Sequence, residues 1–596
     1  MAKTQKTAQP VTKTQAWGRK WLGVALWEWA GLALLVAVGA WLRLFRLDLI
    51  EFKGDEAIAA WLALQFVKGG SLPLAGLMSS VGVTNPPLFI YLLVPMFLVS
   101  GDPSVIGALL VVQSLAAVVI CWHIGRRYYG SLTGLVSAAM FAVSPWAVIY
   151  SRKIWAIDLE PLLTCGVVWA LHALVLGRRP KAIFWVALLV PCLMMNHFSG
   201  FGPLAAVLGV LLLLRPRLDW RWTAGGLLIA GVLALPYVRY QQINHWADLS
   251  QARATVGTDR WSQLPPGMTV HPQYGARLPR RPSEMWQHVL AVYNSGEVED
   301  VLGLSADRRF DPAQLHAQRP GGPWAYFTDS LRLGDTVLQV QQWVFVGAFM
   351  WLAVLGVKGL RRQRGFPWVG VVEDNRERTV WILLFWVIGL VAVFFVARLW
   401  TYLLYFVVLY PVHFLATGAL FQMVHGKWAT KGARVALYAA LGVVLVWNVM
   451  YMLDFYRFVD RNGGAFGTYG SVLGPKREVA KFLAEQGGPK LVEDARAQLD
   501  MTVAPSLGRR PQAPDGLQHP LVVQMDNFGR FELPQVDLPY LILLEKERAR
   551  TTRLPTNMMV VVVDDNRAGF SPQQWQQIVA MRQTNFGPIR LLFVPR

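Results

Sequence analysis

The chain has 596 residues, of which 54% are hydrophobic and only 16% are charged. A soluble globular protein carries about 25% charged residues, so the composition excludes an ordinary soluble domain and predicts a membrane protein. The formal net charge is +20, but the basic residues cluster in short loops between apolar runs. That distribution is the positive-inside pattern of membrane proteins, and we therefore expect no nucleic-acid partner.

The first segment, residues 1–24, is basic and leads into an apolar run with no clear cleavage site. We expect a retained cytoplasmic tail and not a removed signal peptide. The three cysteines stand in apolar runs without the paired spacing of a disulfide framework or a zinc site, so we expect them in the core. They are Cys121, Cys165 and Cys192.

Apolar runs of about 20 residues predict membrane-spanning helices. In chain order the candidate runs are 25–46, 84–100, 104–124, 131–150, 158–177, 182–197, 200–214, 222–238, 337–357, 379–397, 402–424 and 434–453.

Basic loops between these runs predict the orientation, because cytoplasmic loops are rich in Lys and Arg. Two runs separate each basic loop from the next, except before Arg126 and Arg127, where there are three. The run 84–100 starts with Asn85-Pro86-Pro87 and contains Pro95, so we expect it to be re-entrant or to lie at the interface. The prediction is an α-helical polytopic protein of the cell membrane with about eleven spans. Its N-terminus is expected on the cytoplasmic side and its C-terminus on the extracytoplasmic side.

Two regions are not predicted to lie in the membrane. The outer loop 239–336 is polar and rich in Pro and Gly, and a loop this long is usually functional or disordered; we expect a partly ordered lid with a helical stretch at 283–293. After the transmembrane domain (25–455), residues 456–596 predict a small extracytoplasmic α/β domain. Its expected helices are 475–486 and 571–583, and its expected strands are 520–525, 540–544, 558–563 and 590–594.

Acidic residues recur where predicted helices meet the outer side. Asp55 and Glu56 precede one helix, and Asp158 precedes another. Acids favour the first turn of a helix through its dipole, which explains their position without a function. Acids at the edge of a bilayer are nevertheless costly, and we interpret these three as candidate catalytic residues.

Basic residues lie beside these acids. The pair Arg152-Lys153 runs against the positive-inside trend and suits an anionic head group, because the Arg fork can bond two oxygens. Lys53 and Arg398 are further candidates, although Arg398 also fits an interfacial, snorkelling position. Arg43, and likewise Arg46, could point inward to a phosphate. His197 is a lone histidine with no metal-ligand spacing near it, so a structural role is the better interpretation.

Several motifs occur together in a fairly specific order up to about residue 455. They are Gly54-Asp55-Glu56-Ala57, Asn85-Pro86-Pro87 leading to Tyr91, the run 125–130, Ser144-Pro145, Tyr150-Ser151-Arg152 leading to Asp158, and Arg398 ahead of Tyr402. In this order the chain resembles the type C glycosyltransferase superfamily. It is similar to the bacterial group that is like the dolichyl-phosphate-mannose–protein mannosyltransferases and includes the lipid A aminoarabinose transferases.

The resemblance implies an enzyme that moves a sugar from a polyprenyl-phosphate carrier to an extracytoplasmic lipid, glycan or protein. It implies that Asp55 is the base or orients the acceptor, with Glu56 beside it and Asp158 as second acid. Family members often have a basic residue where this chain has Asn85, which moves the expected phosphate contacts elsewhere. The expected phosphate-binding residues are Arg152, Lys153, Arg398 and Lys53, and the expected substrate-lining residues are Asn85, Tyr91, His197 and Tyr402.

No cofactor is predicted with certainty, although two acids and a phosphate could share a divalent cation. A transporter or lipid flippase is the main alternative; it should carry ionisable residues near the middle of its spans. An assembly scaffold, or a polymerase or ligase of surface glycans, also stays open.

Overall fold

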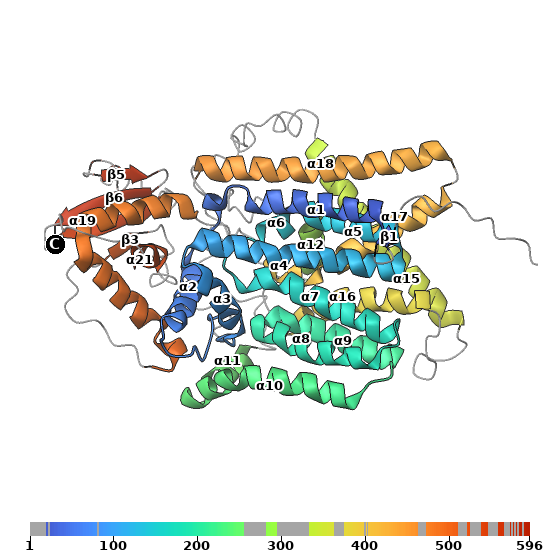
Figure 1. Ribbon diagram of the computed structural model, residues 1–596, viewed down its shortest axis with the longest axis horizontal. Helices are drawn as coiled ribbons and strands as arrows, with labels where there is room; N and C mark the ends of the chain where they lie inside the picture. The colour runs from blue at the N-terminus through green and yellow to red at the C-terminus, as the bar shows by residue number, and fades with distance from the viewer. Residues whose placement is uncertain are drawn as a thin grey trace, which may run out of the picture.

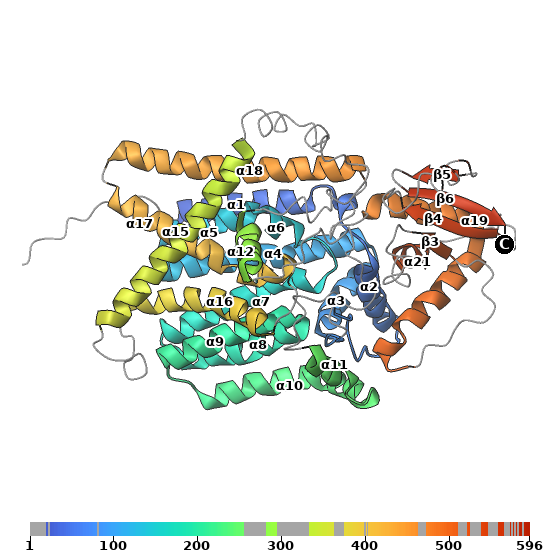
Figure 2. The ribbon, with the colours of Figure 1, turned by 180° about the vertical axis from the view of Figure 1, so that it is seen from behind.

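A computed structural model shows a long helical bundle with a smaller mixed region beside one end (Figures 1 and 2). The residues that the structure describes are 20–21, 24–79, 83–255, 282–294, 333–362, 375–397, 401, 403–428, 430–462, 472–509, 521–524, 538–545, 558–564, 573, 576, 580, 583–586 and 589–595. Two short strands, β1 (Lys20–Trp21) and β2 (Val24–Ala25), pair antiparallel before the first long helix.

The bundle consists of helices that pack on one another and leave part of their apolar surface exposed on the outside. In chain order they are α1 (Leu26–Leu44), α4 (Pro103–Ile124), α5 (Ser131–Val143), α6 (Pro145–Ile149), α7 (Ala156–Val175), α8 (Ile183–Asn196), α9 (Phe201–Leu214), α10 (Trp220–Ile243), α15 (Leu333–Arg362), α16 (Asn375–Ala397), α17 (Val412–Lys427) and α18 (Lys431–Asn462). Short helical turns join them: η2 (Gly125–Tyr129), η3 (Pro180–Ala182), η4 (Phe198–Gly200) and η6 (Leu403–Leu409).

Within the described residues, seven helices are long and apolar enough to cross a membrane: α1, α4 with η2, α7, α10, α15, α16 and α18. The pair η6 and α17 would form an eighth, bent by 55°. The polytopic helical class predicted from the sequence is therefore present. The predicted number of eleven spans also requires the shorter helices α5, α8 and α9 to cross, and it stays a prediction.

Two predicted spans are broken. The run 131–150 divides into α5 and α6 at Ser144, because Pro145 lacks the backbone N–H that would continue the helix. The run 402–424 divides into η6 and α17 at Tyr410-Pro411, and the 55° bend lies there.

The predicted lid is partly a core element. Its first residues extend α10 and then form α11 (Ala247–Thr255). Its expected helix 283–293 is α12 (Pro282–Asn294), and Tyr293 of α12 is 1% exposed. The Tyr410 hydroxyl donates to the Val292 carbonyl at 2.7 Å. The remainder of the loop lies outside the described residues.

The segment between α1 and α4 lies beyond the bundle end. It contains η1 (Leu47–Leu49), α2 (Gly54–Val67) and α3 (Leu88–Val99). With 12 residues α3 is one of the shorter apolar helices, like α5, α8 and α9. The re-entrant or interfacial position expected of the run 84–100 stays a prediction. Pro95, however, lies inside α3 and does not end it.

The region after α18 contains a four-stranded sheet in the order β3-β4-β6-β5. Its elements are α19 (Leu473–Val503), η7 (Pro505–Leu507), β3 (Leu521–Gln524), α21 (Leu538–Glu545), β4 (Met558–Asp564), β5 (Gln583–Phe586) and β6 (Ile589–Pro595). The strands β3 and β4 run parallel, and the other pairs run antiparallel.

Three of the four strands expected here, those at 520–525, 558–563 and 590–594, are present as β3, β4 and β6. The run 540–544 is helix α21 and not a strand: Tyr540 and Leu541 are both buried where α21 packs on α19. A short apolar run cannot distinguish these two structures. The expected helix 571–583 falls mostly outside the described residues, and Gln583 begins β5.

Contacts between helix ends give the bundle two distinct ends. At one end Glu28 of α1 accepts a hydrogen bond from Arg126, and Thr133 of α5 contacts Gln422 of α17. At the other end, α1, α4, α7, α8 and α18 meet the segment containing α2 and the region of α19. The contacts that define this second end form the candidate site.

Candidate functional site

Lys153 lies at the centre of the candidate site, in the turn between α6 and α7, and is 3% exposed. Its Nζ lies 2.5 Å from Glu51 Oε2 and 3.5 Å from Glu56 Oε1. The ammonium also lies 3.8 Å from the ring centroid of Trp155. A buried charge is costly unless it is paired, so the two carboxylates and the aromatic face stabilise a lysine at this depth.

Asp158 lies on the other side of the same turn. It is in the first turn of α7 and is 1% exposed. Its Oδ2 accepts a hydrogen bond from the Lys153 backbone N–H at 3.0 Å. Its Oδ1 has no hydrogen-bond partner among the described residues. Asp158 thus fixes the turn with one oxygen, and the other oxygen remains available as an acceptor.

The segment from Glu51 to Glu56 approaches Lys153 from the start of α2. The Lys53 ammonium lies 2.6 Å from Glu51 Oε1, and the Lys53 backbone N–H donates to Glu56 Oε2 at 3.0 Å. Asp55 occupies the same first turn and is only partly buried. The structure therefore brings Glu56 and Asp158 to one lysine, with Asp55 as the more accessible acid of the helix start.

The buried charges shift one another's proton affinity. Burial alone would lower the pKa of Lys153, but Glu51 and then Glu56 outweigh burial and raise the pKa above its ordinary value. Burial raises the pKa of Glu56, and Lys153 offsets part of that rise. Lys153 consequently stays protonated across the physiological range, whereas Glu56 holds a proton more readily than an exposed glutamate does.

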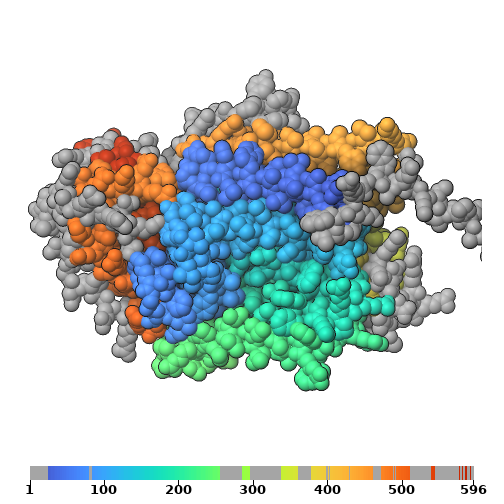
Figure 3. Space-filling model, viewed as in Figure 1, coloured from blue at the N-terminus to red at the C-terminus, as the bar shows by residue number. Residues whose placement is uncertain are grey.

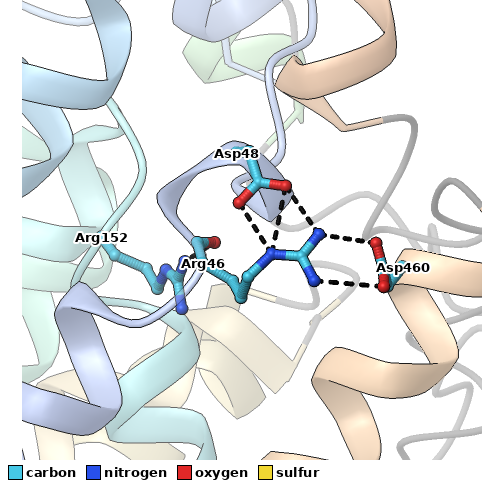
Figure 4. A network of polar contacts seen from close by, with 4 residues as sticks. All are labelled: Arg46, Asp48, Arg152 and Asp460. Carbon is cyan, nitrogen blue, oxygen red and sulfur yellow. Dashed lines mark hydrogen bonds and ion pairs between the residues drawn. The ribbon is translucent and has the colours of Figure 1, made fainter.

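The guanidinium of Arg152, the residue before Lys153, lies beside the end of α18. This group lies 4.8 Å from the ring centroid of Tyr456 and donates to the Arg46 carbonyl. Figure 4 shows the Arg46 side chain between Asp48 and Asp460, which accept from it at 2.8 and 2.6 Å. Hydrogen bonding from Arg46 lowers the pKa of Asp48. Arg152 and Arg46 thus connect α1, α7 and α18.

The sequence suggested that Arg43 could point inward to a phosphate. In the structure its guanidinium binds backbone carbonyls of the bundle instead. Arg43 is fully buried, and its guanidinium donates to the carbonyls of Ala142 (2.7 Å), Phe141 (3.4 Å) and Ala147 (3.4 Å). These carbonyls flank the break between α5 and α6. A helix break inside a membrane leaves backbone groups that need other partners, and Arg43 supplies them.

A second buried acid lies near Asp158. Glu160 is 0% exposed and accepts a hydrogen bond from Ser199 Oγ at 2.7 Å. The Nδ1 of His197 lies 2.8 Å from the same hydroxyl and 3.8 Å from Glu160 Oε1. The ring of His197 packs against Tyr405 with centroids 5.0 Å apart. His197 is therefore held in a polar cluster of the described core, next to the start of α7.

The remaining predicted residues differ in what the structure shows. The backbone of Asn85 pairs with Leu77 and Gly76 at 2.8 Å each. The Tyr91 hydroxyl, on α3, donates to the Pro73 carbonyl at 2.5 Å. Arg398 and Tyr402 lie outside the described residues, so their roles stay predictions.

Sequence reasoning did not select two acids that the structure places in these clusters. Glu51 is 1% exposed and joins Lys53 to Lys153, and Glu160 anchors Ser199. A signal for Glu51 was present, because Glu51 and Lys53 are two residues apart and share a face in extended chain. Tyr456 carried no such signal, because its contact with Arg152 depends on the packing of α18.

A metal site does not stand out in the described part of the chain. No group of three or more His, Cys, Asp or Glu side chains there is placed to hold an ion.

No protein-family model matches this chain, and a search of curated proteins finds no relative. Solved structures do show similarity. The chain is similar to the Archaeoglobus fulgidus oligosaccharyltransferase in the apo form, with a TM-score of 0.48 and 12% identity over 87% of this chain and 64% of that one. It thus matches less than two thirds of that enzyme's length.

Two further solved structures are similar. ArnT from Cupriavidus metallidurans, bound to undecaprenyl phosphate, has a TM-score of 0.44 and 12% identity over 95% of this chain and 98% of that one. Archaeal AglB from Archaeoglobus fulgidus, in complex with an inhibitory peptide and a dolichol-phosphate, has a TM-score of 0.46 and 10% identity over 91% and 70%. At this level of similarity they assign no role to any residue.

Proposed function

We propose that this chain is a membrane glycosyltransferase of the type C kind, which transfers a sugar from a polyprenyl-phosphate-linked donor to an acceptor outside the cytoplasm. One observation carries the proposal: acids from two separate chain segments meet at one buried lysine, at the bundle end where α2 and α7 begin. Such a cluster places a base and positive charge within a short reach of each other, which is what glycosyl transfer from a phosphate requires.

Asp55 is the proposed base. Glu56 already accepts from the Lys53 backbone and lies 3.5 Å from Lys153 Nζ, so its carboxylate is committed within the protein. Asp55 is in the same turn but only partly buried, and we assign it to the acceptor hydroxyl because of this exposure. Asp158, through its Oδ1, is proposed to orient that hydroxyl.

The proposed reaction is a single displacement. The acceptor oxygen attacks the anomeric carbon and its proton passes to Asp55, while the bond from the anomeric carbon to the phosphate oxygen breaks. The polyprenyl phosphate leaves with the electron pair, and the anomeric configuration inverts. Arg152, Lys153, Lys53 and Arg398 are the proposed cations for the leaving phosphate, because charge develops there in the transition state.

The positions of the charged groups do not favour the transporter alternative. A transporter places ionisable side chains near the middle of its spans to bind its cargo. Here Glu56 and Asp158 both stand in the first turn of a helix, and Lys153 lies in a turn between helices. The cluster thus suits chemistry at one face of a membrane.

The lipid can be tested directly. The full chain is purified and its co-purifying lipids are identified by mass spectrometry, and undecaprenyl phosphate is then titrated into the protein in nanodiscs. We expect a co-purifying polyprenyl phosphate and saturable binding of the probe, weakened in Arg152→Met but not in Arg239→Met, which changes an exposed arginine of α10. The proposal would be contradicted if no polyprenyl phosphate co-purified and the probe showed no saturable binding.

A further inference from the structure

The region after α18 contacts the acid-bearing segment directly. Val472 forms an antiparallel bridge with Glu51, and the Leu473 N–H donates to the Ile50 carbonyl at 2.9 Å. In the space-filling view the orange surface of this region adjoins the blue surface of the first segments (Figure 3). The backbone that carries Glu51 is therefore paired with the residues that lead into α19.

One side chain of α19 reaches further into this segment. Lys476 is 3% exposed, and its Nζ donates to the Phe52 carbonyl at 2.6 Å. The first backbone hydrogen bond of α2 is accepted by Lys53 from Ala57, so the Phe52 carbonyl lies outside the helix ladder. A buried carbonyl needs a donor, and Lys476 provides one.

The anchoring has a consequence for the cluster. Phe52 lies between Glu51 and Lys53, the two residues whose side chains join at 2.6 Å beside Lys153. The segment is thus held on one side by Lys153 from the bundle and on the other by Lys476 from α19. Fixing the Phe52 carbonyl also fixes the direction in which the chain enters the first turn of α2, where Asp55 stands.

We propose that Lys476 is a positioning residue for the acid cluster, so that the region after α18 completes the site and does not act as a separate module. This inference rests on the proposed glycosyl transfer for its effect on activity. Its effect on the backbone of residues 50–57 does not depend on what the reaction is.

The next residue offers a matched control. Arg477 lies on the same turn of α19 and donates to Asp102 Oδ1 at 2.7 Å and to Ser104 Oγ at 3.0 Å. It therefore attaches α19 to the start of α4 without contacting the acid-bearing segment. Lys476→Met and Arg477→Met each remove a cationic donor and keep an apolar stem of similar length, but only the first removes the donor to Phe52.

Hydrogen exchange on the full chain in nanodiscs tests the positioning. We expect Lys476→Met to speed amide exchange in residues 50–57 at least tenfold, Lys476→Arg to restore most of the protection, and Arg477→Met to leave this segment unchanged. Equal exchange in the two Met variants, or no change in either, would overturn the inference even if the wild-type enzyme transfers sugar.

Kinetics of transfer from a polyprenyl-phosphate sugar then test the effect on the site. A small displacement of a catalytic group can cost on the order of 100-fold in rate, so we expect kcat to fall at least tenfold in Lys476→Met. KM for the donor should stay within about twofold, and Lys476→Arg should recover activity. A fall of the same size in Arg477→Met would show only a loss of α19 attachment and would refute the specific role of Lys476.

Discussion

Asp55 and Glu56 are neighbours in sequence but have different surroundings. Glu56 is 2% exposed and holds a backbone N–H and a buried ammonium, whereas Asp55 is partly buried in the same helical turn. Two adjacent carboxylates thus differ in function in our proposal: Glu56 fixes the local structure, and Asp55 is the accessible base. Only the more exposed Asp55 suits proton transfer from the hydroxyl of an incoming acceptor.

Replacing Asp55 should separate chemistry from folding. We expect Asp55→Asn to abolish transfer, because an amide cannot take the acceptor proton, while expression and thermal stability stay close to wild type. The comparison is Asp219→Asn, which changes the acid that caps α10 by accepting the Arg221 N–H at 3.1 Å; Asn caps equally well. Full transfer activity in Asp55→Asn would remove this residue from the chemistry.

Lys153 should be coupled energetically to Glu51. Removing one partner of a buried ion pair costs about 3–5 kcal/mol, so Lys153→Met and Glu51→Gln should each lower the thermal stability strongly. In the double variant neither Lys153 nor Glu51 leaves the other unpaired, although Lys53 and Glu56 each lose one partner. The loss should therefore be smaller than the two single losses combined, with a coupling of roughly 0.5–3 kcal/mol. A double-mutant cycle of unfolding in detergent measures this.

The control for that cycle pairs Lys153→Met with Asp219→Asn, which should be additive because the two residues share no partner. If the Lys153–Glu51 cycle is additive as well, the pairing seen at 2.5 Å contributes nothing to stability.

At the scale of elements, the break between α5 and α6 depends on a residue of another helix. Pro145 interrupts the backbone ladder, and Arg43 of α1 donates to three carbonyls around the break. The planar guanidinium can reach several acceptors at once, which a lysine cannot do in a fixed geometry. The broken helix and the arginine are therefore one structural unit, although they are about 100 residues apart, as the separation of Arg43 from Ala142 shows.

Arg43→Met should consequently destabilise the bundle. An unpaired buried carbonyl costs about 1–3 kcal/mol, so we expect a marked fall in the thermal unfolding temperature and only a small recovery in Arg43→Lys. The exposed Arg239 provides the comparison, and Arg239→Met should leave the unfolding temperature nearly unchanged. Equal effects of the two Met substitutions would refute this role of Arg43.

The sequence predicted the long helices well and their interruptions poorly. The run 104–124 became α4 and the run 379–397 became α16, because an apolar stretch of sufficient length has few alternatives in a membrane. The break at Ser144 and the helical state of Tyr540–Leu544 depend on what packs nearby, which no local pattern records. The same limit applies to Glu51: its neighbourhood was visible in the sequence, but its partner Lys153, 102 residues away, was not.

At the scale of the whole molecule, the acid cluster and a basic pair of arginines lie at opposite ends of the bundle. The acid cluster lies at the end where α7 begins, whereas Arg126 and Arg127 follow α4 at the opposite end. Positive loops are retained on the cytoplasmic side, so this separation is the structural basis for our proposal that the acid cluster faces outward.

Cysteine labelling tests the orientation. The three native cysteines are buried and should not react with an impermeant maleimide in intact cells. Lys68→Cys, at the exposed end of α2, should be labelled from outside, and Arg127→Cys, which is also exposed, should react only after the membrane is permeabilised. Labelling of both positions from the same side would disprove the assigned topology.

The contact between Lys476 and Phe52 also bears on how the protein is made. Its two residues are 424 positions apart, so a ribosome finishes every helix of the bundle before it synthesises the lysine that holds the segment between α1 and α4. Until then the segment around Glu51 lacks the hydrogen bond from Lys476 to the Phe52 carbonyl. A partly synthesised chain should therefore have no activity, however many of its helices are already inserted. A premature stop codon ahead of residue 472 should yield a product that is inserted in the membrane but inactive.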